Sequence, residues 1–339
     1  MDCPCFIRSN KVDIAIKLVY TVGLFFVLMI PGIILKKCKL STDGLGKGLS
    51  NLILYIAQPA LIFKSYLRAY DSKILLNMLY VFVFSMAAHV IFALITMLCF
   101  KKTPDATRRM LRFATIFSNA AFMGMPLIAS VIGEEALIYA SIYNISFNGF
   151  LWTLGVYICT ADRDVDGDGI EDGEKIRKKS GTSYVKVLLH PTMIAAFLGL
   201  IFFFLPLDSS DVPSFITEAI TNLGNLVAPI SMIVLGLRLA EIDLRGFFKD
   251  KNLYVFLALR HVILPAVIFA IMRVFAIWLN LHIDVITSVL IMASAPAATS
   301  ATMFAEKYDC DAAYVSKLVA ISTVLSIATM PLVSLLTMI

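Results

Sequence analysis

Charge is scarce in this sequence: 16% of its 339 residues are Asp, Glu, Lys or Arg, whereas 59% are apolar. A soluble domain is closer to about 25% charged and about 45–50% apolar. The shortage of charge therefore excludes an ordinary soluble fold and indicates a chain that crosses the membrane several times. The net charge of +5 is small, so we expect the lipid bilayer as its surroundings and no nucleic-acid partner.

Cysteine and histidine are also sparse, with six and four residues. Cys3 and Cys5 form a Cys-x-Cys pair at the N-terminus, and no cysteine spacing matches a zinc site or a disulfide framework. We interpret these thiols as unpaired, with lipid attachment or metal binding by the N-terminal pair as the alternative. A nucleophile–base pair, a metal cluster and a phosphate loop are missing too, so we expect no enzyme.

Long apolar runs are abundant instead. Ten of them reach the length of about 20 residues that a membrane-spanning helix needs. They cover residues 14–35, 47–68, 74–100, 109–132, 136–160, 184–205, 213–239, 252–277, 284–305 and 313–337, and we number them helices 1 to 10. The first run is too long for a cleaved signal peptide and ends in KKCK. The expected fold is therefore all-α and integral to the membrane.

Lysine and arginine gather in the loops after helices 1, 3, 5 and 7, whereas the loops after helices 4 and 6 contain acidic residues and no cation. The loop after helix 2 departs from this trend with Lys64, Arg68 and Lys73. Because cytoplasmic loops carry the excess of Lys and Arg, the odd-numbered loops are predicted to be cytoplasmic. Both termini are then outside, and the protein is expected in the plasma or inner membrane.

Four prolines repeat at one spacing. Pro59 and Pro229 lie on helices 2 and 7, and Pro126 and Pro296 lie on helices 4 and 9; the differences 229 − 59 and 296 − 126 are both 170. This regularity indicates an internal duplication. Five helices per half is an odd number, so the second half must be inverted in the membrane. The sequence predicts two inverted five-helix repeats, residues 1–161 and 184–339, joined by a cytoplasmic linker at 162–183.

Helices 4 and 9 carry their prolines in small and polar surroundings, SNAAFMGMP with Gly124 and MASAPAATSAT. Proline removes a backbone donor, and hydrocarbon tolerates such a break only where protein or a water-filled cavity satisfies the backbone. Small residues let two broken helices approach closely. Their half-helix N-termini would suit an anionic group. A simple packing kink is the alternative.

Polar residues inside the spans are functional candidates. Those proposed to contact substrate are Asn119, Asn144, Asn148, Ser294, Thr299 and Ser300. Arg260 could offset substrate charge or snorkel to the cytoplasmic surface, and His89 and His261 could carry protons or pack in the core. No Asp or Glu lies mid-span, which argues against a cation as the main substrate and favours a neutral or anionic solute. Sodium or proton coupling stays open.

Four segments, SNAAFMGMPLI, LSNLILYIAQPALIFKSYL, LRHVILPAVIF and APAATSATMFAEKYD, resemble the auxin efflux carrier family, and the resemblance runs from helix 1 to helix 10. It implies ten helices in two inverted repeats, with helices 4 and 9 broken at prolines and crossing at the substrate site. Asn119 matches the substrate-contacting Asn of helix 4, and Pro126 and Pro296 match the crossover prolines. Gln58 takes a position that lines the substrate pocket.

One feature departs from the pattern of that family, and another departs from its plant members. Helix 6 has His190-Pro191 where the family often has Asn-Pro, so a substrate assignment from helix 6 does not carry over. The long loop between helices 5 and 6 is absent, so the chain is similar to the compact, prokaryotic-type members. The family often forms dimers, which makes a homodimer the expected assembly.

The linker contains an acidic motif, DRDVDGDGIEDGEKIRKK. Asp164, Asp166, Asp168 and Asp172 follow the spacing of calcium loops, but Lys175 replaces the usual bidentate Glu. A weak calcium site, with a dissociation constant of about 10⁻⁴ to 10⁻³ M, is one interpretation. A solvated linker is the other, and no other cofactor is expected.

These observations predict a secondary transporter of a small organic anion, a carboxylate. It would work by alternating access, with helices 3–5 and 8–10 moving against the others around a site at the crossed breaks. A sodium-coupled organic anion symporter, a channel-like pathway and a non-transporting solute sensor on a carrier fold remain the alternatives.

Overall fold

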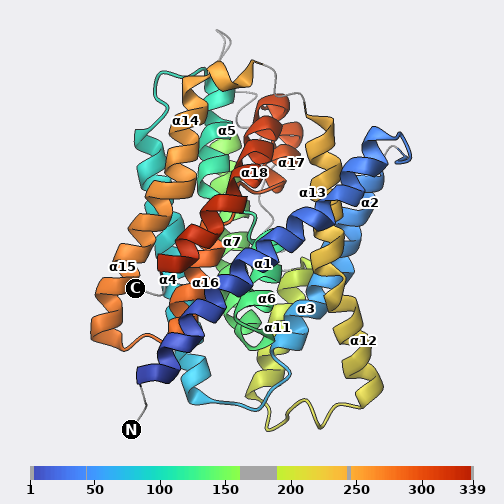
Figure 1. Ribbon diagram of the computed structural model, residues 1–339, viewed down its shortest axis with the longest axis vertical. Coiled ribbons are helices and arrows are strands. Elements are labelled where there is room, and N and C mark those ends of the chain that lie inside the picture. The colour runs from blue at the N-terminus through green and yellow to red at the C-terminus, as the bar shows by residue number, and fades with distance from the viewer. Residues whose placement is uncertain (1–3, 43, 161–188, 243–245, 337–339) are drawn as a thin grey trace.

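The computed structural model describes residues 4–42, 44–160, 189–242 and 246–336 (Figure 1). These residues form helices and short connections, with one isolated β-bridge and no strand among them. The prediction of an all-helical protein is confirmed for this part of the chain. The linker at 162–183, with the calcium candidates Asp164, Asp166, Asp168 and Asp172, lies outside the described residues.

Helical residues occupy each of the ten predicted runs. The first half contains α1 (Pro4–Lys37), α2 (Leu45–Leu52), η1 (Ile53–Ala57), α3 (Gln58–Ser65), α4 (Ser72–Leu98), α5 (Asp105–Ile116), η2 (Ala120–Gly124), α6 (Met125–Val131), η3 (Glu134–Ala136), α7 (Leu137–Phe150), η4 (Leu151–Gly155) and α8 (Val156–Thr160). The second half contains α11 (Pro191–Phe204), α12 (Ser214–Asn225), α13 (Val227–Glu241), η5 (Phe247–Lys249), α14 (Lys251–Ala258), η6 (Leu259–Ile263), α15 (Leu264–Leu279), α16 (Ile283–Ser294), α17 (Ser300–Lys307) and α18 (Ala312–Leu336).

Five helices of the described residues are long and apolar enough to cross a membrane. They are Val19–Lys37, Ser72–Leu98, Ser214–Glu241, Lys251–Leu279 and Ala312–Val333. Shorter apolar helices occupy Ala120–Val131, Pro191–Phe204 and Ile283–Ser294. Length and composition therefore agree with a protein embedded in the bilayer.

Two boundaries differ from those expected. Helix α1 begins at Pro4, ten residues before the predicted start of helix 1. Helix α11 begins at Pro191, after the predicted start at 184. Proline favours the first turn of a helix because its missing N–H has no partner there anyway. The ring of His190 caps the same turn, since the Thr192 backbone N donates to His190 Nδ1 at 3.4 Å.

Wide π-helical turns precede three prolines. The turns η1, η2 and η6 each end two residues before a proline, at Pro59, Pro126 and Pro265, respectively. Proline cannot donate to the carbonyl one turn earlier and its ring pushes that carbonyl away, so the turn opens. Before Pro229, helix 7 is interrupted instead, at Leu226 between α12 and α13. Each proline thus lies near the start of a new helical segment.

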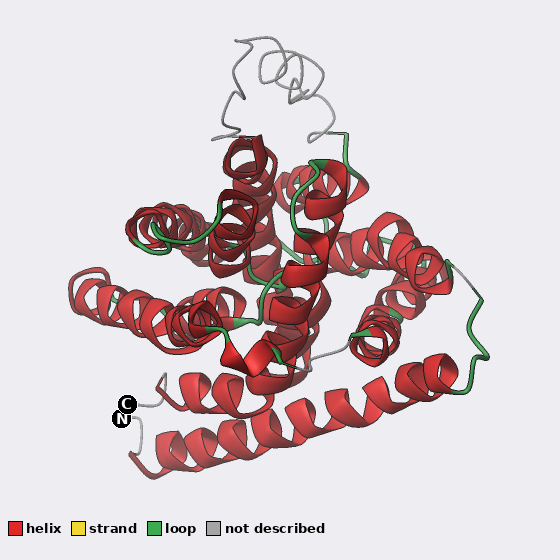
Figure 2. Cartoon of the chain, turned by 90° about the horizontal axis from the view of Figure 1, so that it is seen from above, coloured by secondary structure: helices red, strands yellow, loops and turns green. Residues whose placement is uncertain are grey.

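The helices form two groups. Figure 1 places α2, α3, α12 and α13 on one side of the molecule and α4, α14 and α15 on the other. The long helix α1 packs along α13, and α11 packs along α3; the view from above shows α1 running along one edge (Figure 2). A Cβ on Gly236 would lie 2.1 Å from the Met29 carbonyl oxygen. Helices 1 and 7 are therefore almost in backbone contact, as small residues permit.

Candidate functional site

The breaks in helices 4 and 9 lie against each other. Helix α5 ends at Ile116 and η2 begins at Ala120, and α16 and α17 are separated by residues 295–299. The two extended stretches run antiparallel and share backbone hydrogen bonds. The Asn119 N donates to the Pro296 carbonyl at 2.6 Å, and the Ala298 N donates to the Phe117 carbonyl at 2.9 Å. Backbone groups that have no partner within their own broken helix therefore form hydrogen bonds with the backbone of the other broken helix.

Gly124 and Pro126 belong to the same contact. Gly124 lies beside Met292 of α16, and a Cβ there would come 2.8 Å from the Met292 Sδ. Pro126 is buried in the first turn of α6. The residue types around the breaks therefore let helices 4 and 9 approach closely at their crossing point, which we call the crossover.

Arg260 lies beside the crossover and donates hydrogen bonds to backbone carbonyls of both broken helices. Its side chain is fully buried, so it does not snorkel to the surface. Its Nε donates to the Ala295 carbonyl at 3.0 Å, one terminal nitrogen to the Ala293 carbonyl at 2.7 Å and the other to the Thr115 carbonyl at 3.1 Å. These carbonyls close the C-terminal ends of α16 and α5. A cation at two helix C-termini is stabilised by both helix dipoles.

The histidines pack in the core beside this region. His261 is 2% exposed, and its Nε2 and Nδ1 lie 2.8 Å from Ser322 Oγ and 2.9 Å from Thr329 Oγ1. Ser322 Oγ also accepts from the Ala297 N at 2.9 Å, which ties helix 10 to the helix 9 break. His89 stacks on Phe150 with ring centroids 5.1 Å apart. His89 and His261 are therefore both packed in the protein core.

A cavity of about 240 Å³ lies in front of the crossover. It brings together most of the sequence candidates: Gln58, Asn119, Asn144, Asn148, Thr299 and Ser300. Ser294 does not line it, because this residue lies at the end of α16 on the other side of the extended stretch. Nor does Arg260, so its role as a charge partner of the substrate stays a prediction.

Several polar atoms on the cavity wall have no hydrogen-bond partner among the described residues. They are Gln58 Oε1, Ser118 Oγ, Asn119 Nδ2, Asn144 Oδ1 and Ser300 Oγ. Asn148 is held by its Nδ2, which donates to the Asn144 backbone carbonyl at 2.8 Å. An unpaired buried polar group costs about 1–3 kcal/mol. These unpaired atoms belong to residues that line the cavity.

Arg238 is the functional candidate that sequence reasoning missed. It lies in the last turn of α13 and lines the cavity, and its buried Nε has no partner among the described residues. The nearest acid along the helix, Glu241, is engaged elsewhere, since Lys36 Nζ lies 2.6 Å from Glu241 Oε1. A lone cation inside the predicted span 213–239 was the available signal. His190, on the departing motif of helix 6, lines the same cavity.

The cavity extends toward the end of the molecule with the odd-numbered loops. Its wall includes Ser50 near the start of predicted helix 2 and Arg238 near the end of α13, both close to odd-numbered loops. At the opposite end, the Tyr66 and Ser141 hydroxyls lie 2.7 Å apart and Lys64 Nζ lies 2.6 Å from Glu134 Oε2. These contacts join the end of helix 2 to the start of helix 5.

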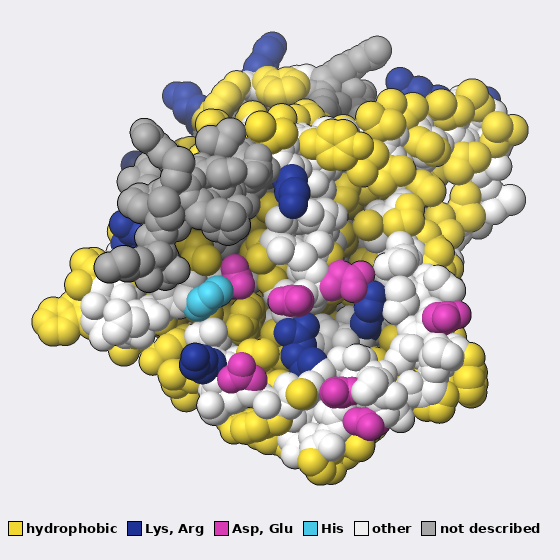
Figure 3. Space-filling model, turned by 60° about the horizontal axis from the view of Figure 1, so that its bottom comes forward, with side chains coloured by type: hydrophobic (Ala, Val, Ile, Leu, Met, Phe, Trp, Pro, Cys, Tyr) yellow, Lys and Arg dark blue, Asp and Glu magenta, His cyan; other side chains and the backbone are white. Residues whose placement is uncertain are grey.

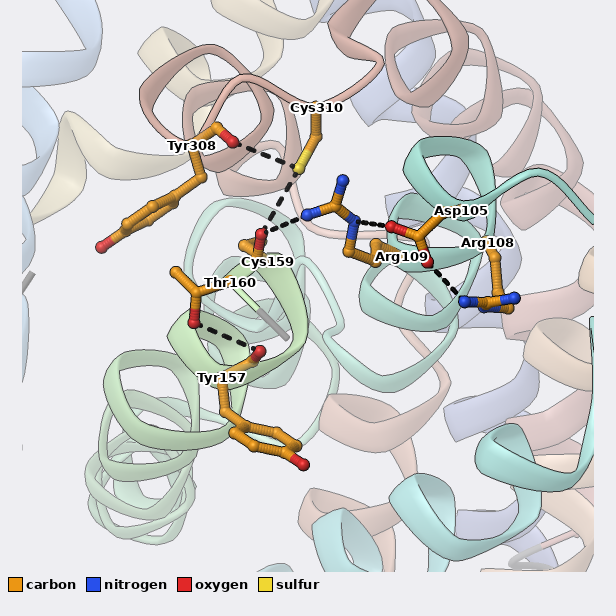
Figure 4. A network of polar contacts seen from close by, with 8 residues as sticks. All are labelled: Asp105, Arg108, Arg109, Tyr157, Cys159, Thr160, Tyr308 and Cys310. Carbon is orange, nitrogen blue, oxygen red and sulfur yellow. Dashed lines mark hydrogen bonds and ion pairs between the residues drawn. The ribbon is translucent and has the colours of Figure 1, made fainter. Parts of the chain in front are cut away.

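A second polar network braces the end of the molecule near the odd-numbered loops (Figure 4). Arg109 donates to the Cys159 carbonyl at 2.8 Å, and its Nε lies 3.0 Å from the Asp105 carboxylate. The Cys310 thiol lies 3.8 Å from the same carbonyl. The network therefore joins helix 4, helix 5 and the loop between helices 9 and 10. Within the described residues, no group of His, Cys, Asp or Glu could hold a metal ion.

The chain is similar to known membrane transport proteins. A family model described as membrane transport protein matches residues 19–334. The chain is 28% identical over 316 residues to an uncharacterized transporter of Methanothermobacter thermautotrophicus. The matched region covers 92% of this chain and 96% of the relative. It is 24% identical over 310 residues to an uncharacterized transporter of Methanocaldococcus jannaschii, with 90% of this chain and 94% of the relative covered.

Proposed function

The chain belongs to the membrane transport protein family, that of the auxin efflux carriers, and from this premise we propose that it is a secondary transporter of a small organic anion, a carboxylate. The observation that carries the proposal is the position of Arg238: this arginine, which has no acidic partner among the described residues, lines the cavity in front of the crossover. The guanidinium fork matches a carboxylate with two parallel hydrogen bonds.

The surrounding groups fit the same class of solute. The Asn119 Nδ2 and the Ser300 hydroxyl can donate to carboxylate oxygens, and both belong to the broken helices. Trp152 and Phe147 supply an apolar wall. Ligand sites combine such apolar surface with a few polar groups that orient the ligand. The cavity therefore suits a small molecule with a charged end and a carbon skeleton.

We also propose the inverted repeat, with repeats at 1–161 and 184–339 and the linker at 162–183 between them. Helix 1 packs on helix 7, and helix 6 packs on helix 2, so each first helix of a half packs on the second helix of the other half. Two inverted repeats produce this exchange. With the odd-numbered loops cytoplasmic, both termini are outside and the cavity opens toward the cytoplasm.

Transport then requires the opposite end to open. The Tyr66–Ser141 and Lys64–Glu134 contacts join helix 2 to the helix 4–5 region. Movement of helices 3–5 and 8–10 against helices 1, 2, 6 and 7 would break both contacts. The crossover would move as one body, because its backbone hydrogen bonds and Arg260 connect members of the moving group only.

The test is reconstitution in liposomes, with currents recorded after jumps of malate, malonate, succinate or indole-3-acetate, with and without sodium. We expect a saturable current that both Asn119→Ala and Arg238→Gln weaken, by about tenfold or more for the arginine. Arg112→Gln is the matched control, since Arg112 donates to the Met97 carbonyl and does not line the cavity.

The alternatives give different results in the same experiment. Flux without saturation would indicate a channel-like pathway, and a strict sodium requirement would indicate a symporter. Binding without flux would indicate a sensor. Absence of both flux and binding for every anion, with electroneutral exchange excluded by radiolabelled counterflow, would contradict the carboxylate proposal.

A further inference from the structure

A second arginine occupies the position in the first half that Arg238 occupies in the second. Arg68 and Arg238 are 170 residues apart (238 − 68), the same offset that relates the proline pairs. Asp71 and Glu241 are also 170 residues apart (241 − 71). The sequences RAYD and RLAE therefore end helices 2 and 7 with the same arrangement, an arginine followed three residues later by an acid.

The structure places these two arginines at opposite ends of the molecule. Arg238 lies at the end with the odd-numbered loops, which we call the inner end. There it lines the cavity and also a second groove with Lys47. Arg68 follows the end of α3 at the outer end and lines an open groove of about 710 Å³ together with Asp71 and Glu135. Figure 3 shows basic and acidic side chains close together on this outer face.

Neither arginine is paired with the acid of its own motif within the described residues. Asp71 caps α4, because its Oδ1 accepts from the Lys73 backbone N at 2.7 Å. Glu241 pairs with Lys36. The Arg68 Nε donates to the Ser65 carbonyl at 3.1 Å, which orients the guanidinium and leaves its two terminal nitrogens for another acceptor.

We propose that Arg68 is the outer counterpart of Arg238, an anion-recruiting subsite that receives a carboxylate when the outer end opens. The inference rests on the proposed function and its inverted repeat, because an inverted repeat exchanges the roles of its halves between the inward-open and outward-open states. Arg238 serves the solute at the inner end in the present state, and Arg68 serves it at the outer end in the other.

Opening of the outer end would change the charges around Arg68. Glu135 shares its groove, and the neighbouring Glu134 pairs with Lys64 of α3. Both glutamates belong to the turn before helix 5, in the group that moves. When that group moves away, Glu134 and Glu135 separate from Lys64 and Arg68 on helix 2. The outer surface becomes more positive as it opens, and a charged mouth raises the local concentration of an oppositely charged solute.

The first test measures malate transport from each side, in vesicles with one orientation of the protein. With Cys3 and Cys5 replaced by Ser, exposed Cys38 in the loop after helix 1 reports that orientation through its reaction with an impermeant maleimide. At low ionic strength, Arg68→Gln is expected to raise KM about three- to fivefold for malate applied outside, with little change for malate applied inside. Arg238→Gln should show the opposite preference. An equal change on both sides, or none, overturns the proposal.

Lys73→Gln is the matched control, since it removes the same charge from the same face without lining the groove. Arg68→Lys should keep the KM for malate applied outside close to that of the wild type if charge attracts the solute. Both the wild-type KM and its change should depend on salt, because exposed charges are screened.

A second readout does not require transport. With Cys3, Cys5 and the exposed Cys38 replaced by Ser, Ala69→Cys places a thiol next to Arg68 in the same groove. Its reaction rate with an anionic methanethiosulfonate, relative to a cationic one, should fall about three- to fivefold when Arg68 becomes Gln. An unchanged ratio overturns the subsite even if no tested anion is transported. Absence of transport together with a changed ratio contradicts only the proposed function.

Discussion

Replacing Arg260 with Met tests whether one buried cation holds the crossover together. Met has a similar length and keeps apolar packing, but it donates no hydrogen bond. The replacement removes the donors from the Thr115, Ala293 and Ala295 carbonyls, which belong to two different broken helices. We expect a large loss of stability and, with it, loss of transport.

The magnitude follows from the structure. Three buried carbonyls that lose their donor cost about 1–3 kcal/mol each, or about 3–9 kcal/mol together. The side chain is fully buried, so removing its charge also removes a desolvation cost and offsets part of that loss. We expect a net loss of about 3–5 kcal/mol, a large fraction of the about 5–15 kcal/mol that stabilises a typical domain.

The assay is thermal unfolding of the purified protein in detergent, followed by flux measurements on the folded fraction. Arg112→Met is the control, because Arg112 loses a single 3.2 Å hydrogen bond to the Met97 carbonyl. Arg260→Lys should fall between wild type and Arg260→Met, since an ammonium cannot span carbonyls on two helices as a guanidinium fork does. If Arg260→Met unfolds at the same temperature as Arg112→Met, the reasoning is refuted.

Three further changes probe the same region. Gly236→Ala should destabilise the protein by about 1–3 kcal/mol in thermal unfolding, because its Cβ would meet the Met29 carbonyl oxygen at 2.1 Å; a midpoint equal to wild type would show that helices 1 and 7 can separate freely. Ser322→Ala should lower the unfolding midpoint, since it leaves the buried Ala297 N–H unpaired at about 1–3 kcal/mol. Asn119→Ala should reduce flux while leaving the midpoint nearly unchanged, because its Nδ2 has no partner among the described residues; a large fall in the midpoint would assign Asn119 to bracing the break.

Much of the site was accessible from sequence because its chemistry is local. Pro126 and Pro296 break their helices wherever they are placed, since a missing N–H acts on the preceding turn of the same chain. Small and polar neighbours then indicate that the breaks are buried against protein. This reasoning selected Asn119 and Ser300, and the rule that polar residues inside spans are functional candidates added Asn144. The structure gathers all three around one cavity.

Arg238 and Ser294 show where such reasoning stops. Both lie within predicted spans, yet Arg238 lines the cavity and Ser294 does not. The difference depends on which face of each helix meets the crossover. That face is fixed by packing, such as the near contact of helix 7 with helix 1 at Gly236, and not by the residues next to it in sequence.

The sequence by itself determined that this protein is helical, apolar enough for the bilayer and interrupted at defined points. Hydrophobic length and proline geometry act within about 20 residues, so a linear pattern contains them. Only the tertiary structure decided what the interruptions bind. Arg260 reaches carbonyls 145 and 35 positions away along the chain, and the Asn119 N–H finds Pro296 on another helix. Such partners are chosen by the folded arrangement of the helices, because buried polar groups must be satisfied by whatever the packing brings near.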